Sequence, residues 1–186
     1  MKFTSYKDEC IDLAVDLVNT ENPVKGSDGL DSLEALEDFL RAHRVVRRKA
    51  PDEADLAEVR ALRERLRAVF DAADADTAVR LVNDLLAESG ARPYLSDHDG
   101  HPWHFHYTPP DAPLARHLAA ETAMGLGVVL VSGGFERLHV CEGERCLDVF
   151  VDRSKNRSRR FCSPEVCGNR ESVKAYRRRR QEQPAP

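Results

Sequence analysis

The stretch that decides the fold is CEGERCLDVFVDRSKNRSRRFCSPEVC, residues 141–167. It holds four cysteines in two pairs: four residues lie inside each pair, and fifteen residues separate the pairs. Zinc prefers four thiolates in a tetrahedron, and two close pairs joined by a spacer supply them. We therefore predict that one structural Zn²⁺ ion is bound by Cys141, Cys146, Cys162 and Cys167. Four cysteines leave no open position for water, so hydrolytic zinc chemistry is not expected.

Other interpretations of these cysteines remain open. Two disulfides would need an oxidising compartment, but the first nine residues have no apolar core and no small-residue cleavage site. We therefore expect no secretion signal and a reducing, cytoplasmic location. Four unrelated buried cysteines are not expected to fall within only 27 positions of the sequence. An iron–sulfur cluster remains an alternative, because it binds through the same thiolates. Cys10 stands apart on an apolar helix face, where a packed thiol is expected.

The residues around the cysteines predict a small finger. Val149–Val151 has the composition of a strand, residues 152–156 that of a turn, and residues 171–176 that of a helix. Knuckle, hairpin and helix in that order indicate a treble-clef-like zinc finger over residues 136–180, here called the zinc module. Large apolar residues are few in it, so we expect it to melt without metal while the N-terminal part stays folded. Residues 181–186 are expected to form a disordered tail.

Basic residues crowd the zinc module. Residues 153–180 contain 11 basic and 2 acidic residues, a density that attracts a phosphate backbone. Asn169 and Arg170 are expected at a helix start, where such side chains read adenine and guanine. The predicted nucleic-acid contacts are Arg153, Lys155, Arg157, Arg159, Arg160, Asn169, Arg170, Lys174, Arg177 and Arg178. Two alternatives are a solvated charged surface and a basic patch that grips the acidic remainder of the chain.

That remainder, residues 1–135, is here called the helical body. It carries a formal charge of −9, against +5 for the residues that follow. Apolar residues at helical spacing predict helices over 8–19, from Ser32, from Pro51, from a cap at Asp76 to Gly90, and over 113–132. Alternation over residues 103–107 predicts a β-hairpin near 92–108. The expected fold is mainly α with a small β-hairpin (α+β): a helical N-terminal domain followed by the finger.

Three segments resemble a known family. Residues 162–170, CSPEVCGNR, resemble the signature of the CGNR zinc finger. Residues 150–161, FVDRSKNRSRRF, are similar to that family's F-x-D-x-S-x-N-x-x-R-R-W run, with Phe161 in place of Trp and with Leu147 upstream where Gly is frequent. Residues 13–20, LAVDLVNT, resemble the LDLVNT opening of the ABATE domain, the usual partner of this finger.

The resemblance covers nearly the whole chain and carries several implications. Members are described as stress-induced transcription regulators of bacteria, and their finger is described as DNA-binding. The four cysteines would then be the zinc ligands, and Gly168, Asn169 and Arg170 would be characteristic residues of the finger.

Three polar residues near the end of the first helix allow two interpretations. Either Asp16, Asn19 and Thr20 line a ligand pocket, or Asn19 and Thr20 cap the helix or fix the loop that follows it. No glycine-rich phosphate loop and no nucleophile elbow occurs in the sequence, so we do not expect an enzyme.

Three functions are therefore weighed. The first is a DNA-binding transcription regulator, which binds double-stranded DNA and whose N-terminal domain senses a small molecule or binds a protein partner, with no membrane involved. The second is an RNA- or ribosome-associated zinc protein. The third is an enzyme that uses an N-terminal cleft and carries the finger as a structural appendage.

Overall fold

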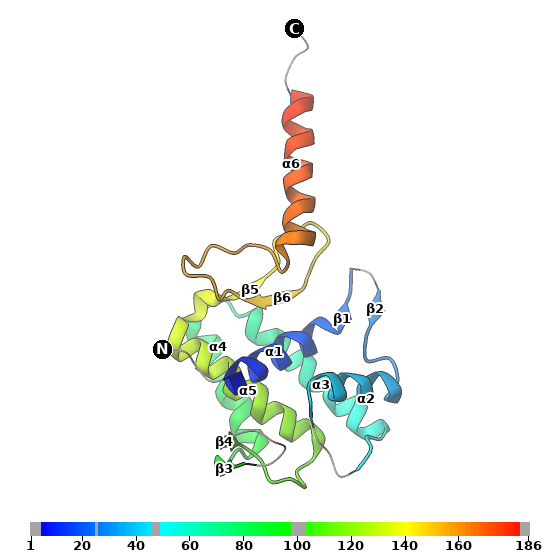
Figure 1. The fold of residues 1–186 in the computed structure, drawn as a ribbon, viewed down its shortest axis with the longest axis vertical. Coiled ribbons are helices and arrows are strands. Elements are labelled where there is room, and N and C mark those ends of the chain that lie inside the picture. Colours follow the sequence, from blue (N-terminus) through cyan, green and yellow to red (C-terminus); the bar gives the residue numbers. More distant parts are fainter. Residues whose placement is uncertain (1–4, 25, 46–48, 98–102, 183–186) are drawn as a thin grey trace.

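The computed structural model describes residues 5–24, 26–45, 49–97 and 103–182 (Figure 1). Its helices are α1 (Ser5–Asn19), α2 (Leu33–Ala42), α3 (Glu53–Phe70), α4 (Ala75–Ser89), α5 (Leu114–Gly133) and α6 (Asn169–Glu182), with short helical turns η1 (Phe135–Arg137) and η2 (Pro164–Gly168). Its strands form three antiparallel pairs: β1 (Glu21–Asn22) with β2 (Ser27–Asp28), β3 (Tyr94–Ser96) with β4 (His104–His106), and β5 (Leu138–Val140) with β6 (Val149–Val151). The predicted class, mainly α with a small β-hairpin, is confirmed.

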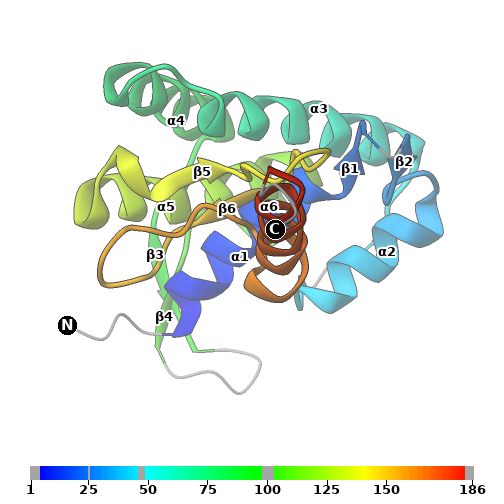
Figure 2. The same ribbon diagram turned by 90° about the horizontal axis from the view of Figure 1, so that it is seen from above.

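Helix α5 is the centre of the helical body, and α1 and α4 pack along it (Figure 2). Gly125 allows the closest approach, because a Cβ atom there would lie 2.8 Å from the backbone carbon of Cys10 on α1. Among the described residues α5 alone is long and apolar enough to cross a membrane, but 56% of it is buried inside the protein. Its apolar side chains, such as Leu118 and Leu126, belong to the core.

Side-chain caps fix where the helices of the body begin. The Ser32 hydroxyl accepts the Ala35 N–H at the start of α2, as the sequence predicted. The predicted cap at Asp76 is wrong: α4 begins at Ala75, and the carboxylate of Asp74 accepts the Thr77 N–H at 2.8 Å. Gly90 ends this helix in the left-handed conformation, with φ of 67°.

The predicted β-hairpin is formed by β3 and β4, with Leu95 opposite Phe105. Residues 98–102, between these strands, lie outside the described residues. One face of the hairpin exposes Leu95, Trp103 and Phe105. This hairpin lies at the end of the body that is far from the zinc module (Figure 1).

The β5–β6 pair joins the two parts of the chain. Val149 and Val151 face the body and belong to its hydrophobic core, together with Leu138. Phe150, which points to the opposite side of β6, packs with the buried cysteines instead. The predicted domain boundary at residues 135 and 136 therefore falls just before the β5–β6 hairpin. One face of this hairpin packs in the core of the body, and the other packs against the cysteines.

This pairing differs from the predicted order of knuckle followed by hairpin. Strand β6 pairs with β5, which precedes the first cysteine pair, so the knuckle is the turn of the hairpin. Residues 152–161 contain no strand. Their backbone is fixed by side-chain contacts, described below, in place of a sheet.

Helix α6 stands away from the rest of the molecule (Figure 1), and its main contact is with the η2 turn before it. The predicted tail of residues 181–186 starts too early, because Gln181 and Glu182 are the last residues of α6. Residues 183–186 lie outside the described residues.

Candidate metal centre and nucleic-acid interface

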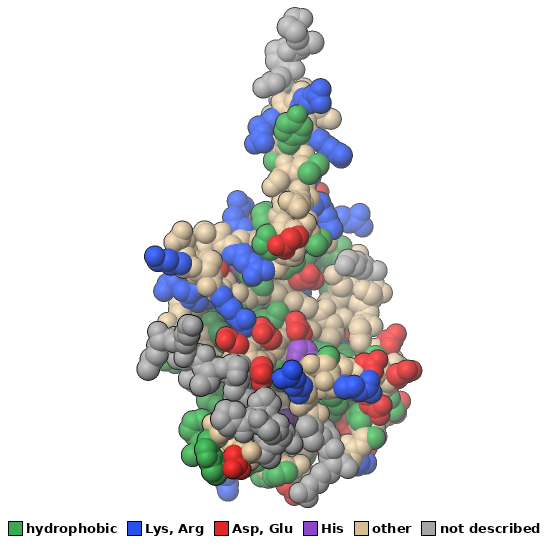
Figure 3. Space-filling view, viewed as in Figure 1, with side chains coloured by type: hydrophobic (Ala, Val, Ile, Leu, Met, Phe, Trp, Pro, Cys, Tyr) green, Lys and Arg blue, Asp and Glu red, His purple; other side chains and the backbone are tan. Residues whose placement is uncertain are grey.

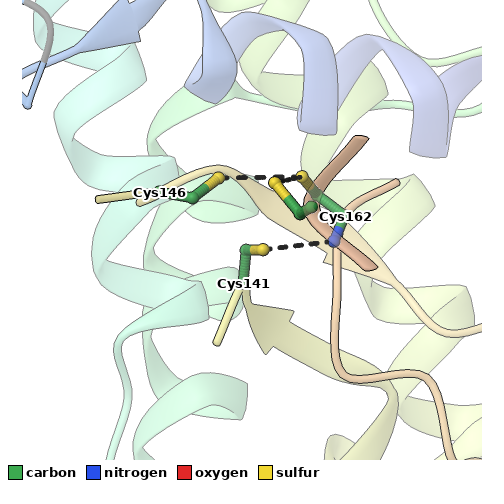
Figure 4. Close-up of side chains that lie close together, drawn as sticks. Cys141, Cys146 and Cys162 are labelled. Atoms are coloured by element: carbon green, nitrogen blue, oxygen red, sulfur yellow. Dashed lines mark hydrogen bonds between the residues drawn. The ribbon is translucent and has the colours of Figure 1, made fainter. Parts of the chain in front are cut away.

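The four cysteines meet at one point between the β5–β6 turn and the η2 turn. Their four Sγ atoms lie within 4.8 Å of one another. The Sγ atom of Cys162 is 3.7 Å from that of Cys146 and 3.6 Å from that of Cys167 (Figure 4). A tetrahedral zinc ion with Zn–S bonds of about 2.3 Å places sulfurs about 3.8 Å apart. The spacing of the thiols therefore fits one Zn²⁺ ion.

Backbone N–H groups support the thiolate form of Cys141. The N–H of Cys162 and the N–H of Gly143 donate to Cys141 Sγ at 3.3 and 3.4 Å. Burial opposes the charged form, but these donors outweigh it and hold the pKa of the Cys141 thiol below its usual value. Burial raises the pKa of the Cys146 thiol to about 12. Zinc binding therefore has to release a proton from Cys146.

Asp152 organises the loop that leads to the second cysteine pair. Its carboxylate is fully buried and accepts the Ser154 N–H at 2.7 Å and the Arg159 N–H at 2.9 Å. Burial raises the pKa of this carboxyl, but the N–H donors outweigh burial and keep the pKa below its ordinary value. The anion closes residues 152–159 into a loop and brings Cys162 to the first cysteine pair.

Comparison with protein-family models places these features in a family. A model named ABATE, described as "Putative stress-induced transcription regulator", matches residues 12–133, well over half of the chain. The chain belongs to the ABATE family. A second model, the CGNR zinc finger, matches residues 137–180. No curated protein matches the chain.

These matches confirm the resemblance that the sequence suggested. The cysteine cluster is the metal site of the CGNR zinc finger, and it holds one structural zinc ion through Cys141, Cys146, Cys162 and Cys167. Bound by these four cysteines, the ion would join the knuckle, the loop after β6 and the η2 turn that precedes α6. Every ligand position is filled by the protein, so the bound zinc gives structure to the finger.

Four of the predicted nucleic-acid contacts of the CGNR finger are paired with carboxylates. Arg153 lies 2.6 Å from Asp12 on α1, so this contact joins the finger to the ABATE domain. The other three pairs are Arg157 with Glu136, Arg160 with Glu142, and Lys174 with Glu144. All these side chains are about half exposed, so water and salt screen each pair and it adds little to stability.

Arg159 has a structural position. Its guanidinium lies 4.9 Å from the centre of the Phe150 ring and donates to the carbonyl oxygens of Phe161 and Cys162. These contacts tie the loop to the second cysteine pair. Lys155 is exposed on the same loop.

The remaining predicted contacts lie on α6. Asn169 begins the helix and donates through Nδ2 to the Glu165 carbonyl at 3.0 Å, and Arg170 is exposed beside it. Arg177 and Arg178 lie two turns further on, also exposed. The helix carries six basic and two acidic residues. Figure 3 shows Lys and Arg side chains around α6 and its base, and Asp and Glu mostly over the body below.

The three polar residues near the end of α1 have separate partners. Asp16 Oδ2 lies 3.5 Å from Nε2 of His43, the residue that follows α2. Thr20 donates to the Leu17 carbonyl at 2.7 Å, which caps the helix. Asn19 reaches β6: its Nδ2 donates to the Val149 carbonyl at 2.9 Å, and its Oδ1 accepts the Val149 N–H at 2.7 Å. The contacts of Thr20 and Asn19 match the interpretation that these residues cap the helix and fix the chain after it. Asn19 in addition fixes a strand of the finger.

Sequence reasoning missed the contacts that join the ABATE domain to the finger. Besides Asn19, Arg67 on α3 donates to the Leu147 carbonyl at 2.5 Å, and Asn22 donates to Asp148 at 3.4 Å. Asn19 was a candidate because of its place in the LDLVNT-like segment. Nothing in the sequence indicated that its partner is 130 residues away.

Proposed function

We propose that this protein is a transcription regulator that binds double-stranded DNA through its CGNR finger. The observation that carries the proposal is α6, a helix with six basic and two acidic residues that projects from an acidic body. Fourteen residues give a helix about 21 Å long, which suits a DNA groove in length. The family description, a stress-induced transcription regulator, supports the same function.

The ABATE domain has a second role in this proposal. Its formal charge of −9 keeps it away from the polyanion. We assign it the binding of a small-molecule ligand or a protein partner, and we assign the whole protein to the cytoplasm, without catalytic activity. Asn19 and Arg153 link this domain to the finger, so a change in α1 would reach the DNA-binding part through them.

The ion pairs reduce the number of basic side chains that are expected to contact DNA directly. Phosphate has to displace Glu142 or Glu144 before it reaches Arg160 or Lys174. Arg170, at the base of α6, and Arg177, two turns further on, are both exposed and lie on the same side of the helix. We therefore expect these two arginines to contribute most per side chain.

Fluorescence anisotropy with a labelled duplex, over a series of salt concentrations, tests the proposal. The zinc-loaded full chain should bind with an affinity that falls steeply with salt. Arg170→Ala and Arg177→Ala should each lower the slope of log K against log salt by about 0.9. Arg80→Ala, an exposed arginine on α4, is the matched control and should leave the slope unchanged.

Structured RNA of the same length is measured in parallel. Tighter binding to RNA than to the duplex would favour the alternative function of an RNA- or ribosome-associated zinc protein. Binding to neither, with zinc bound and α6 folded, would contradict both functions.

A further inference from the structure

A cleft of about 350 Å³ opens between the loop before the second cysteine pair and the start of α6. Its walls include Arg160 and Phe161 from the loop, and Asn169 and Ser172 from the helix. This volume is in the range of about 300–1,000 Å³ that ligand sites of small molecules have. A single nucleobase with its sugar is therefore within its capacity.

The loop side of the cleft offers flat surfaces. The Arg160 guanidinium lies over the Phe161 ring, 6.0 Å from its centre. Glu142 pairs with this guanidinium, so Arg160 is fixed as a planar group and its charge is largely compensated. Planar guanidinium and aromatic groups stack on nucleobases, and a compensated arginine suits a base better than a phosphate.

The helix side of the cleft continues along α6. One side of the helix, here called the Tyr176 side, is formed by residues three or four positions apart: Asn169, then the adjacent Ser172 and Val173, then Tyr176 and Arg180. Val173 is 48% exposed and Tyr176 is 58% exposed, an unusual position for apolar side chains. Ser172 and Tyr176 are four positions apart, a rise of about 6 Å along the helix.

The chemistry of this surface indicates which kind of ligand it binds. The excess of basic residues on α6 attracts a polyanion. Exposed aromatic rings beside those cations bind bases by stacking, and a duplex hides the faces of its bases inside its own stack. Single-stranded nucleic acid presents both groups at once.

We propose that the cleft and the Tyr176 side bind single-stranded nucleic acid, with one unstacked base in the cleft against Arg160 and Phe161 and a neighbouring base on the Tyr176 ring. The inference rests on the proposed nucleic-acid binding and adds single strands to the double-stranded DNA that α6 is proposed to bind. Arg177 and Arg180, beside Tyr176, reach the phosphates between the bases.

Anisotropy of the zinc-loaded full chain with a labelled single strand, and with the duplex of the same sequence, tests this inference. Tyr176→Ala should weaken binding of the single strand about 5- to 150-fold, the range for loss of one base–aromatic stack. Tyr176→Phe keeps the ring and should bind like the wild type. Ser172→Leu places a larger side chain at the mouth of the cleft and should weaken the single strand more than the duplex.

Phe105→Ala is the matched control, because Phe105 is a similarly exposed aromatic residue at the other end of the body. It should leave both affinities unchanged. Unchanged single-strand affinity in Tyr176→Ala, with zinc content and helicity intact, would overturn the inference.

The two proposals fail in different ways. A wild type that binds the duplex but not the single strand overturns only the inference about the cleft. A wild type that binds neither overturns the proposed function as well.

Discussion

The helical body buries a large apolar core made by four long helices, whereas the separate cluster of the zinc module buries only Phe150 and three cysteines, with Cys162 and Phe161 partly buried. Burial of apolar area stabilises the first, and metal coordination stabilises the second. The β5–β6 hairpin belongs to both, with valines in one core and Phe150 in the other. A small basic module buries too little apolar area to be stable by burial alone. Its structure therefore depends on metal coordination and on the one hairpin that it shares with the body.

The largest expected effect comes from removal of zinc. Structural zinc supplies about 10–16 kcal/mol of apparent binding free energy, far more than the small cluster around Phe150 provides. After chelation, amide hydrogen exchange should become fast in α6 and in residues 152–161, while α3 and α5 stay protected. Addition of Zn²⁺, but not Mg²⁺, should restore protection. Equal loss of protection in α5 would show that the body also depends on the metal.

Two substitutions in β6 separate the two cores. Phe150→Ala removes a ring that packs on the cysteines and should destabilise the zinc module by about 3–5 kcal/mol, measured as weaker zinc affinity. Val149→Ala, one residue away, removes two methyl groups from the body core and should lower the thermal stability of the body by about 2 kcal/mol. If both variants changed zinc affinity equally, the hairpin would not divide its faces as described.

Acid sensitivity probes an ion pair inside the body. The Arg63 guanidinium donates to Asp28 at 2.6 and 3.0 Å and holds the pKa of that carboxyl below its usual value near 3.9. A lowered carboxyl pKa adds stability above the unfolded value, and this stability is lost as pH falls through the folded value. Asp28→Asn should cost about 3 kcal/mol near neutral pH, because the buried Arg63 loses its main partner.

The measurement is urea unfolding from pH 7 downward. The difference between wild type and Asp28→Asn should shrink as the pH falls from the unfolded value near 3.9 through the folded pKa of Asp28. A difference that is constant with pH would mean that the charge of Asp28 is not what stabilises the pair.

The next effect concerns the join between the two parts. Asn19→Ala leaves the N–H and carbonyl groups of Val149 without their side-chain partner, at a cost of about 1–3 kcal/mol. Urea unfolding should show the loss, and hydrogen exchange should show it at Val149. Asn83→Ala, an exposed asparagine on α4, is the control and should be close to neutral.

The smallest effect is expected from the knuckle carboxylates. Glu142→Gln releases Arg160 from its ion pair, so one more cation becomes available to phosphate. Duplex affinity should rise slightly, and the salt slope should steepen by about 0.9. Glu37→Gln, on the exposed face of α2, serves as the control. Weaker binding by Glu142→Gln would mean that Glu142 serves to position Arg160 for binding.

Local sequence predicted the parts that local chemistry determines. Cysteine spacing gave the metal site, and apolar periodicity gave the helices, because both patterns are confined to neighbouring positions. The cap of α4 was misplaced because Asp74 and Asp76 are both competent caps, so residue type alone does not tell which of them precedes the helix.

Contacts between residues far apart in the sequence could not be predicted from such local patterns. The partner of Asn19 is a backbone group on β6, which carries no side-chain signal. The carboxylates that hold Arg153, Arg157 and Arg160 were counted as general acidic charge, although each has one specific cation. The density of basic residues therefore predicted where the basic surface lies. It did not predict which of its cations are paired with a carboxylate.

The central claim is that zinc holds the basic helix in a shape that binds a polyanion. The most direct test measures zinc content and duplex affinity across salt concentrations on one preparation, before chelation, after it and after zinc is restored. We predict one zinc per chain, salt-sensitive binding that is lost with the metal, and recovery when zinc returns. Metal-free protein that binds the duplex with the same affinity and the same salt slope would contradict the claim.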